Sequence, residues 1–552
     1  MTLAPELVLV EASVHALDPA GSRATALAVG GGRILAVGTD NEILALAGPR
    51  TAVERLDGAT VVPGLIDAHN HLLATGDLLG QVLLYDCRTI GEIVERVAER
   101  ARHLRPGEWI LGRGWDESLL AERRHPTRHD LDSVSPANPV VLQRVWNRLA
   151  ANTAALRACG ISRETADPRA GELYAGGFER DQAGEPTGLF RDRAKHLVLE
   201  HVPALDDDAR VAAVERACHA YNDVGLVGVA EPGLYPYEMR AFDRARREGR
   251  LTVRTDMLVA GWGWAAAGGW STGPPLPEEG LEERILALDI GDGFGDDLLR
   301  IGGVKLLPDG GVGDRTARLF EPYSAEPGNR GSWVVDPGRV REAIAWVHHA
   351  GRSMDSHTCG DEAQEVVVRA YAEAQERDPK PWLRHRVHHA YLPTPMALAL
   401  MARHRVAAVV SNPFLASLGE SFVASLGEER AARMMPMRTY LDAGVTLAGS
   451  SDSPVADYDP WVGIQAAATR RTALRRTLGE AERISPLDAL HSYTTGAAAA
   501  LGVERDRGSL EPGKLADLVV LDRDPFAVPP DELARVRPLA TMLGGRWVFD
   551  AR

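Results

Sequence analysis

The chain has 552 residues, of which 45% are hydrophobic and 25% are charged, so it can bury a large core but is too long for one compact unit. Its net charge of −15 argues against the phosphate backbone of nucleic acid as a partner and favours a self-repelling, soluble surface. One basic cluster, formed by Arg470, Arg471, Arg475 and Arg476, has a spacing that predicts a solvated helix face.

The N-terminal segment MTLAPELVLVEASVHAL lacks the basic start of a signal peptide and turns polar early. No later apolar run approaches the roughly 20 residues that span a bilayer. The cysteines Cys87, Cys159, Cys218 and Cys359 include no C-x-x-C pair, which indicates neither a disulfide scaffold nor a thiolate zinc site. We therefore expect a cytoplasmic protein without a membrane role.

The most informative motif is VVPGLIDAHNH, an apolar strand that ends in His69 and His71. Side chains two residues apart in a strand share a face, so both imidazoles can converge on one ion. An isolated H-x-H is more often a chance pair in a loop. The interpretation therefore depends on the rest of the chain.

Short apolar runs that end in polar residues recur eight times along the chain. They occupy residues 65–71, 226–231, 252–259, 304–307, 353–357, 386–389, 407–411 and 445–451. Helical patterns, such as residues 341–349, lie between the later runs. This count predicts an α/β fold with a (β/α)8 TIM barrel, whose chemistry lies at the carboxyl ends of the strands.

Four more candidate ligands or proton carriers lie where these runs finish: Lys305, His357, His389 and Asp452. Histidine, carboxylate and a modified lysine are ligands that zinc accepts. Taken singly, each has a better structural explanation, such as a solvated lysine, a hydrogen-bonded histidine or an aspartate that caps a turn. Taken together, in this order after a strand-end H-x-H, they favour a metal site.

This order resembles the amidohydrolase superfamily, whose members carry H-x-H on the first barrel strand, lysine on the fourth, histidine on the fifth and sixth, and aspartate on the eighth. Six phrases are similar to its long-insert branch, which includes N-substituted formamide deformylase: GRGWDES, GEPTGLFRD, VKLLPDGGVGDRTA, HTCGDEA, SSDSPV and GSLEPGKLADLVVLDRDPF. The resemblance covers nearly the whole chain.

Residues before 62 and after about 504 alternate and turn at Gly and Asp as small antiparallel strands do. In the resembling family both termini build one β-sandwich, which assigns residues 1–62 and 504–552 to that domain and residues 63–503 to the hydrolase barrel. Residues 79–222 lie between barrel strands one and two and far exceed the usual loop of about 2 to 6 residues. They predict an inserted subdomain, and insertions at the catalytic face usually select substrate.

The resemblance implies one or two divalent metal ions, zinc above all, and a ligand set of His69, His71, Lys305, His357, His389 and Asp452. An ammonium cannot ligate, so Lys305 is implied to carry a carbamate formed with carbon dioxide; an unmodified lysine favours one metal. A metal lowers the pKa of bound water from 15.7 to about 7. Asp452 is then free to take the proton and deliver it to a leaving nitrogen, as general base and general acid in turn.

His388 competes with His389 for the sixth-strand position, because adjacent strand residues face opposite ways and only one is expected to point inward. The family places its ligand immediately before alanine, which favours His389 with Ala390. Asp67, Asp309 and Asp361 are candidates for orienting the ligands, with caps and turns as nearly equal explanations.

The candidate substrate contacts are Trp115, Asp116, Arg144, Arg148 and Arg315. Family members commonly show an Asp-Gly-His step where this chain has Trp146, Asn147 and Arg148, so the family's substrate is not carried over. Arg144 and Arg148 offer a carboxylate-binding site in its place.

The expected activity is therefore metal-dependent hydrolysis of a non-peptide C–N bond, of amide, N-formyl or N-acyl type, in a small molecule. Alternatives are a cyclic amide or ester hydrolase and a deaminase, although Gly360 stands where deaminases place a glutamate and leaves only Glu362 and Glu365 for that role. A non-catalytic regulatory protein on a hydrolase scaffold is a different class. Its members usually lose a ligand or the acid/base, and here the set is complete. We expect no nucleic acid or membrane partner and leave a homo-oligomer open.

Overall fold

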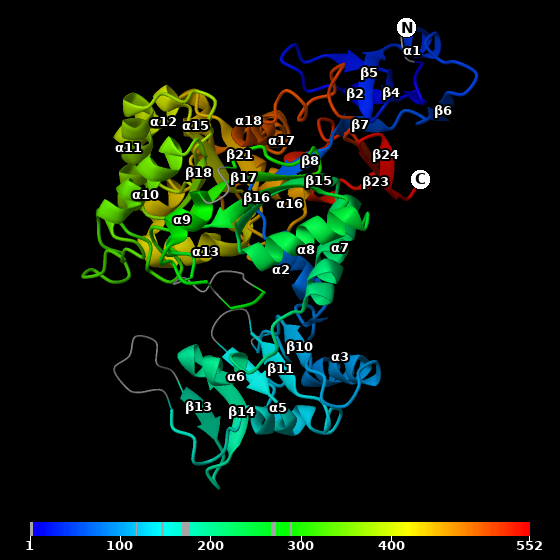
Figure 1. Cartoon of the computed structure of the whole chain (residues 1–552). Coiled ribbons are helices and arrows are strands. Elements are labelled where there is room, and N and C mark those ends of the chain that lie inside the picture. The colour runs from blue at the N-terminus through cyan, green and yellow to red at the C-terminus, as the bar shows by residue number, and fades with distance from the viewer. Residues whose placement is uncertain are drawn as a thin grey trace. The chain divides into compact units, whose positions relative to one another are not determined.

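The computed structural model describes residues 4–117, 119–144, 148–167, 177–265, 272–274, 276–286 and 290–552. The chain divides into two compact units, one formed by Met1–Ala74 with Ala217–Arg552 and the other by Thr75–Arg216 (Figure 1). The larger unit carries the barrel, and each unit has its own hydrophobic core.

Eight parallel strands form the sheet of the larger unit, in the order β21-β20-β19-β18-β17-β16-β15-β8. They are β8 (Leu65–Asp67), β15 (Leu226–Leu234), β16 (Arg254–Ala260), β17 (Leu299–Leu306), β18 (Met354–Thr358), β19 (Arg386–His389), β20 (Ala407–Ser411) and β21 (Leu447–Ser450). Backbone hydrogen bonds from Ala68 N to Gly449 O (3.0 Å) and from Asp452 N to His69 O (2.9 Å) bring the first and last strands together. Each predicted run overlaps one of these strands, so the TIM-barrel prediction is confirmed.

Helices follow most of the strands, and α10, α11 and α12 lie outside the barrel strands in Figure 1. The principal ones are α8 (Pro236–Arg247), α10 (Pro337–His349), α11 (Asp361–Arg377), α12 (Pro395–His404), α13 (Phe414–Leu426), α16 (Pro460–Thr469) and α18 (Thr495–Leu501). Three of them begin in the same way, with the capping side chains of Asp336, Thr394 and Asp459 each followed by proline. The side-chain oxygen satisfies free N–H groups and proline fixes a helical φ, which explains why α10, α12 and α16 start where they do. None of the described helices is both long enough and apolar enough to cross a membrane.

Strands from both ends of the chain share one six-stranded sheet, in the order β24-β23-β22-β7-β2-β3, beside a four-stranded sheet, β5-β4-β1-β6. The strands are β1 (Leu7–Val10), β2 (Ser13–His15), β3 (Arg23–Ala24), β4 (Ala26–Gly30), β5 (Arg33–Gly38), β6 (Ala52–Arg55), β7 (Thr60–Pro63), β22 (Leu518–Leu521), β23 (Pro538–Leu543) and β24 (Arg546–Asp550). Leu9 and Leu27 of the smaller sheet join Val61 and Leu518 of the larger one in a single hydrophobic core. The opposite face of the smaller sheet is buried too, because Val8, Val10, Ala26 and Ala28 pack with Ile43 of α1 (Asp40–Leu44) in a second core.

A buried ion pair links the barrel to the segment that leads into β22. The guanidinium of Arg254, in β16, donates from Nε to Asp517 Oδ2 (2.6 Å) and from Nη2 to Asp517 Oδ1 (2.7 Å). Both side chains are almost fully buried. Paired, bidentate geometry is the arrangement in which such charges are tolerated away from water.

The unit formed by Thr75–Arg216 has a six-stranded sheet, in the order β13-β14-β12-β11-β10-β9. Its strands are β9 (Val82–Leu83), β10 (Ile110–Arg113), β11 (Val140–Gln143), β12 (Arg148–Ala151), β13 (Gly177–Arg180) and β14 (Pro186–Arg191). Helix α3 (Ile90–Arg102) buries Ile90, Ile93 and Val97, which lie three and four residues apart as an amphipathic helix requires.

The basic cluster at Arg470 does not form a solvated helix face, and that prediction is wrong. Helix α16 ends at Thr469, and Arg470 follows it in the left-handed region at φ +52°. Its guanidinium is fully buried and donates to the carbonyl oxygens of Leu478 (2.6 Å), Met435 (2.9 Å) and Met434 (2.7 Å). Three buried carbonyls that need donors account for an arginine in this position.

Candidate metal and catalytic site

The residues predicted to bind metal all lie at or just beyond the carboxyl ends of barrel strands. They are His69 and His71 after β8, Lys305 in β17, His357 in β18, His389 at the end of β19, and Asp452 after β21. Parallel strands bring their carboxyl ends to one face of the barrel, so residues almost 400 positions apart in the sequence become neighbours.

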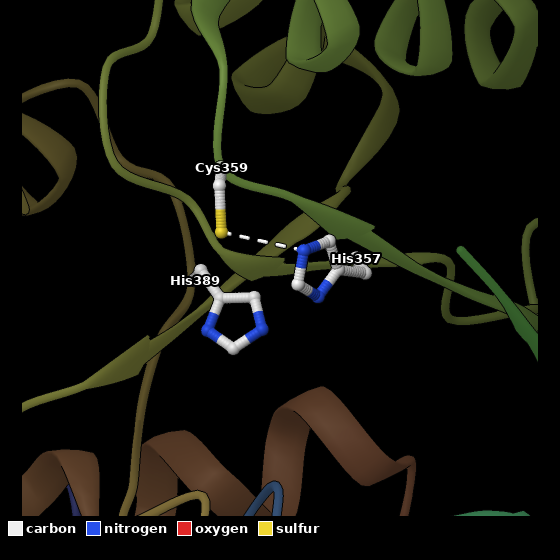
Figure 2. Close-up of side chains that lie close together, drawn as sticks. All are labelled: His357, Cys359 and His389. Carbon is white, nitrogen blue, oxygen red and sulfur yellow. Dashed lines mark hydrogen bonds between the residues drawn. The ribbon is translucent and has the colours of Figure 1, made fainter. Parts of the chain in front are cut away.

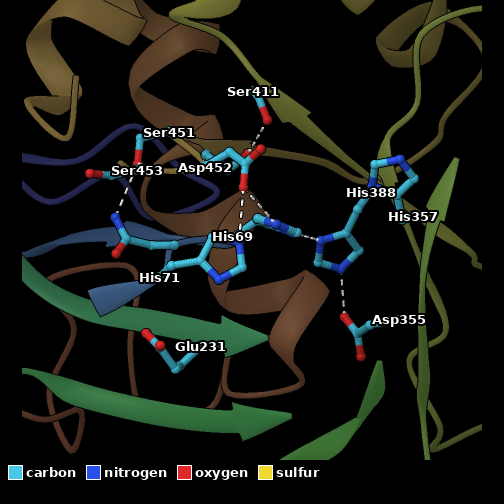
Figure 3. A network of polar contacts seen from close by, with 12 residues as sticks. His69, His71, Glu231, Asp355, His357, His388, Ser411, Ser451, Asp452 and Ser453 are labelled. Carbon is cyan, nitrogen blue, oxygen red and sulfur yellow. Dashed lines mark hydrogen bonds and ion pairs between the residues drawn. The ribbon is translucent and has the colours of Figure 1, made fainter. Parts of the chain in front are cut away.

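One group consists of His69, His71 and Asp452, all buried (Figure 3). Asp452 Oδ1 lies 3.0 Å from Nε2 of His69 and 3.2 Å from Nε2 of His71. The potential ligand atoms of all three lie within 4.8 Å of one another. With metal–ligand bonds of about 2.0 to 2.2 Å, neighbouring donors of a tetrahedral zinc site lie about 3.4 Å apart. The group therefore has nearly the dimensions of a metal site.

A second group consists of His357, Cys359 and His389, whose potential ligand atoms also lie within 4.8 Å of one another (Figure 2). The ring centroids of His357 and His389 are 4.4 Å apart, and His389 lies 5.3 Å from the ring of His69 in the first group. The two groups are therefore adjacent.

Two buried nitrogen atoms at this place lack hydrogen-bond partners within the described part of the chain: Lys305 Nζ and His389 Nδ1. Both side chains are almost completely buried, at 1% and 3% exposure. A buried polar atom without a partner costs about 1 to 3 kcal/mol, which a bound ligand would recover. Imidazoles, a carboxylate and two unsatisfied nitrogens form a donor set that fits a divalent transition metal.

The protonation states suit metal binding. Burial lowers the pKa of His69 to about 3 and that of His357 to about 4, and it also lowers the pKa of His71. Burial alone would raise the pKa of Asp452, but the neighbouring imidazoles outweigh it and hold that pKa well below its usual range. Burial lowers the pKa of the Lys305 amine to about 8. At neutral pH the site therefore offers neutral imidazoles and an ionised carboxylate.

Asp67 fixes the segments that carry the first group. Its carboxylate accepts hydrogen bonds from Ser451 Oγ (2.6 Å), Ser451 N (3.1 Å) and His69 N (3.1 Å). These bonds join the end of β8 to the end of β21, so Asp67 holds His69 and Asp452 in register. This position agrees with the orienting role considered for Asp67.

Asp309 fixes the backbone that carries the second group, His357, Cys359 and His389. Its carboxylate accepts from the backbone N–H groups of Cys359 (3.2 Å), Gly360 (2.8 Å) and Arg318 (2.9 Å). Asp361 accepts from Phe320 N (2.9 Å) in the same loop. These carboxylates fix the end of β18 against the loop that follows β17.

His388 and His389 both reach the site, so the expectation that only one points inward is wrong. His388 Nδ1 contacts Nδ1 of His69, and its Nε2 lies 2.6 Å from Asp355 Oδ1, which makes a chain of polar contacts from Asp452 to Asp355 (Figure 3). His389 has a φ of +68° and Ala390 one of +48°. The alternation of strand side chains therefore stops at His389, which reaches His357 as well.

Trp115 is fully buried in the hydrophobic core of the smaller unit and donates from Nε1 to His125 Nδ1 (3.4 Å). It presents no surface to a substrate, so the prediction that Trp115 contacts substrate is wrong. Arg144 donates from Nε to Glu117 Oε2 (2.6 Å) and lies 3.7 Å from Asp116 Oδ1. Arg144 is therefore already paired with carboxylates of its own unit.

Arg148 begins β12, and the other two residues of the altered family step, Trp146 and Asn147, lie outside the described residues. Arg315, in the loop after β17, forms an ion pair with Glu326. Neither arginine contacts the two metal-binding groups within the described residues, so their substrate roles stay predictions.

The glutamates that kept a deaminase possible are engaged elsewhere. Glu362 pairs with Arg318 (2.9 Å), and Glu365 accepts from Thr394 Oγ1 (2.5 Å) and pairs with Arg369 (2.7 Å). Both carboxylates are therefore engaged in structural contacts of helix α11.

Sequence reasoning missed Cys359 because it looked only for C-x-x-C pairs. His357-Thr358-Cys359 has the same two-residue spacing as His69-Asn70-His71, and that spacing was the available signal. Glu231, at the end of β15, was missed too; it is buried, contacts Leu72 N and has its pKa raised by burial. No sequence signal singled it out.

Comparisons with known proteins agree with this geometry. The model of the amidohydrolase family matches residues 53–549. The chain is 30% identical over 551 residues to the putative amidohydrolase YtcJ of Bacillus subtilis, covering 97% of this chain and 98% of that protein. It is 31% identical over 559 residues to N-substituted formamide deformylase of Arthrobacter pascens, covering 99% and 98%.

Among solved structures, an uncharacterized metal-dependent hydrolase from Pyrococcus furiosus is similar, with a TM-score of 0.76, 28% identity, and coverage of 94% of this chain and 99% of that one. The chain belongs to the amidohydrolase family.

Proposed function

We propose that this protein is a metal-dependent hydrolase that cleaves a non-peptide C–N bond, of amide, N-formyl or N-acyl type, in a small molecule. The observation that carries the proposal is the convergence of His69, His71 and Asp452 beside His357 and His389 at the strand ends of the barrel. The names of the Arthrobacter pascens deformylase and the Pyrococcus furiosus hydrolase support the bond type and the metal, respectively.

His69, His71 and Asp452 would hold one divalent ion, and His357 and His389 a second. Zinc suits these nitrogen and oxygen donors. Lys305 would join them as a carbamate, since its lowered pKa increases the share of neutral amine that can react with carbon dioxide. When bound, the ion supplies a Lewis acid that polarises the substrate carbonyl and acidifies a water molecule.

Asp452 carries the proton transfer. Its ionised carboxylate accepts the proton that water loses as the oxygen attacks the carbonyl carbon. It then delivers that proton to the nitrogen as the C–N bond breaks, so the products are a carboxylic acid and an amine. Asp452 Oδ1 lies 3.0 Å from His69 Nε2 and 3.2 Å from His71 Nε2, so the proton acceptor lies directly beside the nitrogen atoms that would hold the ion.

The roles of the other parts belong to the same proposal. Residues 1–62 with 504–552 would form a β-sandwich scaffold. The inserted residues 79–222 would select the substrate, and Asp116, Arg144, Arg148 and Arg315 are the residues proposed to bind it. We also propose that the protein is cytoplasmic and that its substrate is a free small molecule.

The test is to incubate the zinc-loaded protein with panels of N-formyl amines, N-acyl amino acids, cyclic imides and lactones. We expect equal amounts of amine and carboxylic acid from an N-formyl or N-acyl compound, and none from the Asp452→Asn variant. Turnover of lactones alone, or release of ammonia from amino-substituted rings alone, would contradict the proposed bond type. No turnover of any panel by zinc-loaded protein would contradict catalysis.

A further inference from the structure

We propose that Cys359 is a third protein ligand at the position held by His357 and His389, and that its thiolate makes this position selective for a thiophilic ion such as zinc. This inference rests on the proposed metal dependence. It adds a ligand that neither the comparisons nor the strand-end pattern assigns.

The geometry of the three side chains supports it. Cys359 Sγ lies 3.3 Å from Nε2 of His357, and the thiol and both rings face the same space (Figure 2). Zinc bonds of about 2.3 Å to sulfur and about 2.0 to 2.1 Å to nitrogen place these donors about 3.5 Å apart in a tetrahedral site. Only a small adjustment would admit the ion.

A second observation is independent of the cysteine. His389 Nδ1 is buried without a hydrogen-bond partner within the described residues, beside this group. Buried imidazole nitrogens normally find a partner, and an ion bound between the three side chains would be one.

The backbone of Cys359 is held in place before any ion binds. Asp309 accepts the N–H groups of both Cys359 and Gly360. A Cβ atom on Gly360 would lie 1.8 Å from the carbonyl oxygen of Arg318, so the two segments are in close contact. The backbone that carries the thiol is therefore already ordered beside His357, which lowers the entropic cost of binding an ion.

Binding exchanges a proton for the ion. The thiol proton leaves to solvent, and the freed sulfur electron pair forms the bond to the metal. Thiolate favours zinc, cobalt or cadmium over magnesium and manganese, which prefer oxygen. His69, His71 and Asp452 offer only nitrogen and oxygen, so the two positions differ in selectivity.

The test uses full-length protein loaded with cobalt(II) and, separately, with zinc. We expect a near-ultraviolet sulfur-to-cobalt charge-transfer band in the wild type, and a sulfur neighbour at about 2.3 Å in zinc X-ray absorption. The band should vanish in Cys359→Ala and Cys359→Ser and persist in Cys218→Ala, a buried cysteine of α7 (Asp207–Asp223). The affinity for the zinc ion held by His357 and His389 should fall at least about tenfold in both Cys359 variants.

Wild-type protein that binds metal without the band and without a sulfur neighbour would overturn the inference, whether or not the variants fold. A band that persists in a folded Cys359 variant would do the same. If such protein still hydrolyses C–N bonds, the proposed function stands and only the role of Cys359 is wrong. Protein that binds no divalent ion under any condition overturns the proposed metal dependence as well.

Discussion

Replacing Asp452 with asparagine should remove most of the turnover while leaving the fold and the metal largely in place. Asparagine keeps the shape of the side chain and its place 3.0 Å from His69 Nε2 and 3.2 Å from His71 Nε2. Its neutral amide, however, is not basic enough to accept the proton from water. General acid and base groups typically contribute about 10² to 10⁴ in rate. That range corresponds to about 2.7 to 5.4 kcal/mol in the activation free energy.

The stability of the metal-free protein should change less. Hydrogen bonds to a charged group contribute about 1.5 to 3 kcal/mol and neutral ones about 0.5 to 1.5 kcal/mol, so two weakened bonds lower the free energy of unfolding by about 2 kcal/mol. This loss leaves a domain of ordinary stability folded.

The assay compares kcat for amine release per bound metal in the wild type, Asp452→Asn and the control Asp457→Asn, with far-ultraviolet circular dichroism and metal content measured on each. Asp457 is exposed and lies in the same segment. A kcat within threefold of the wild type in Asp452→Asn, at equal metal content, would refute the proton-transfer role and reassign Asp452 to structure.

Three further predictions follow from buried groups. Lys305→Ala should lose bound metal together with activity, and short carboxylic acids should restore part of both by supplying the missing oxygen; full metal content in a folded, active variant would exclude the carbamate. Arg254→Met leaves the buried carboxylate of Asp517 without its arginine partner, so the free energy of unfolding measured in urea should fall by about 3 to 5 kcal/mol. The control Arg438→Met, at a partly exposed ion pair, should lower it by less than about 1 kcal/mol. Burial lowers the pKa of His385 from 6.5 to about 3. Below pH 6.5 the unfolded state binds a proton that the folded imidazole does not, so His385 alone should contribute a fall of about 1.4 kcal/mol in unfolding free energy per pH unit toward pH 3. His385→Gln should reduce the measured slope by that amount. An unchanged slope would show that His385 makes no such contribution.

The barrel could be predicted because its signal is local. Each strand is a short apolar run, and the residues that serve the site stand at its end, as at His69, His71 and Asp452. The order of these residues along the chain was sufficient to place them at one face.

The parts that were not predicted depend on conformation or on neighbours distant in sequence. His388 and His389 both reach the site because φ is positive at His389. No pattern in the sequence predicts that backbone conformation. Arg470 is buried by carbonyls from two other segments, and Trp115 by a core that only the folded unit assembles. Cys359 is visible in the sequence, but its potential as a metal ligand depends on the short distance to His389 that the fold creates.

The most direct test of metal-dependent C–N hydrolysis is amine release from an N-formyl or N-acyl substrate by protein stripped of metal and then titrated with zinc. Stripped protein should show no turnover above background, and turnover should rise in proportion to bound zinc until one or two ions are bound. Full turnover by stripped protein, or zinc-saturated protein that releases no amine from any such substrate, would contradict the account.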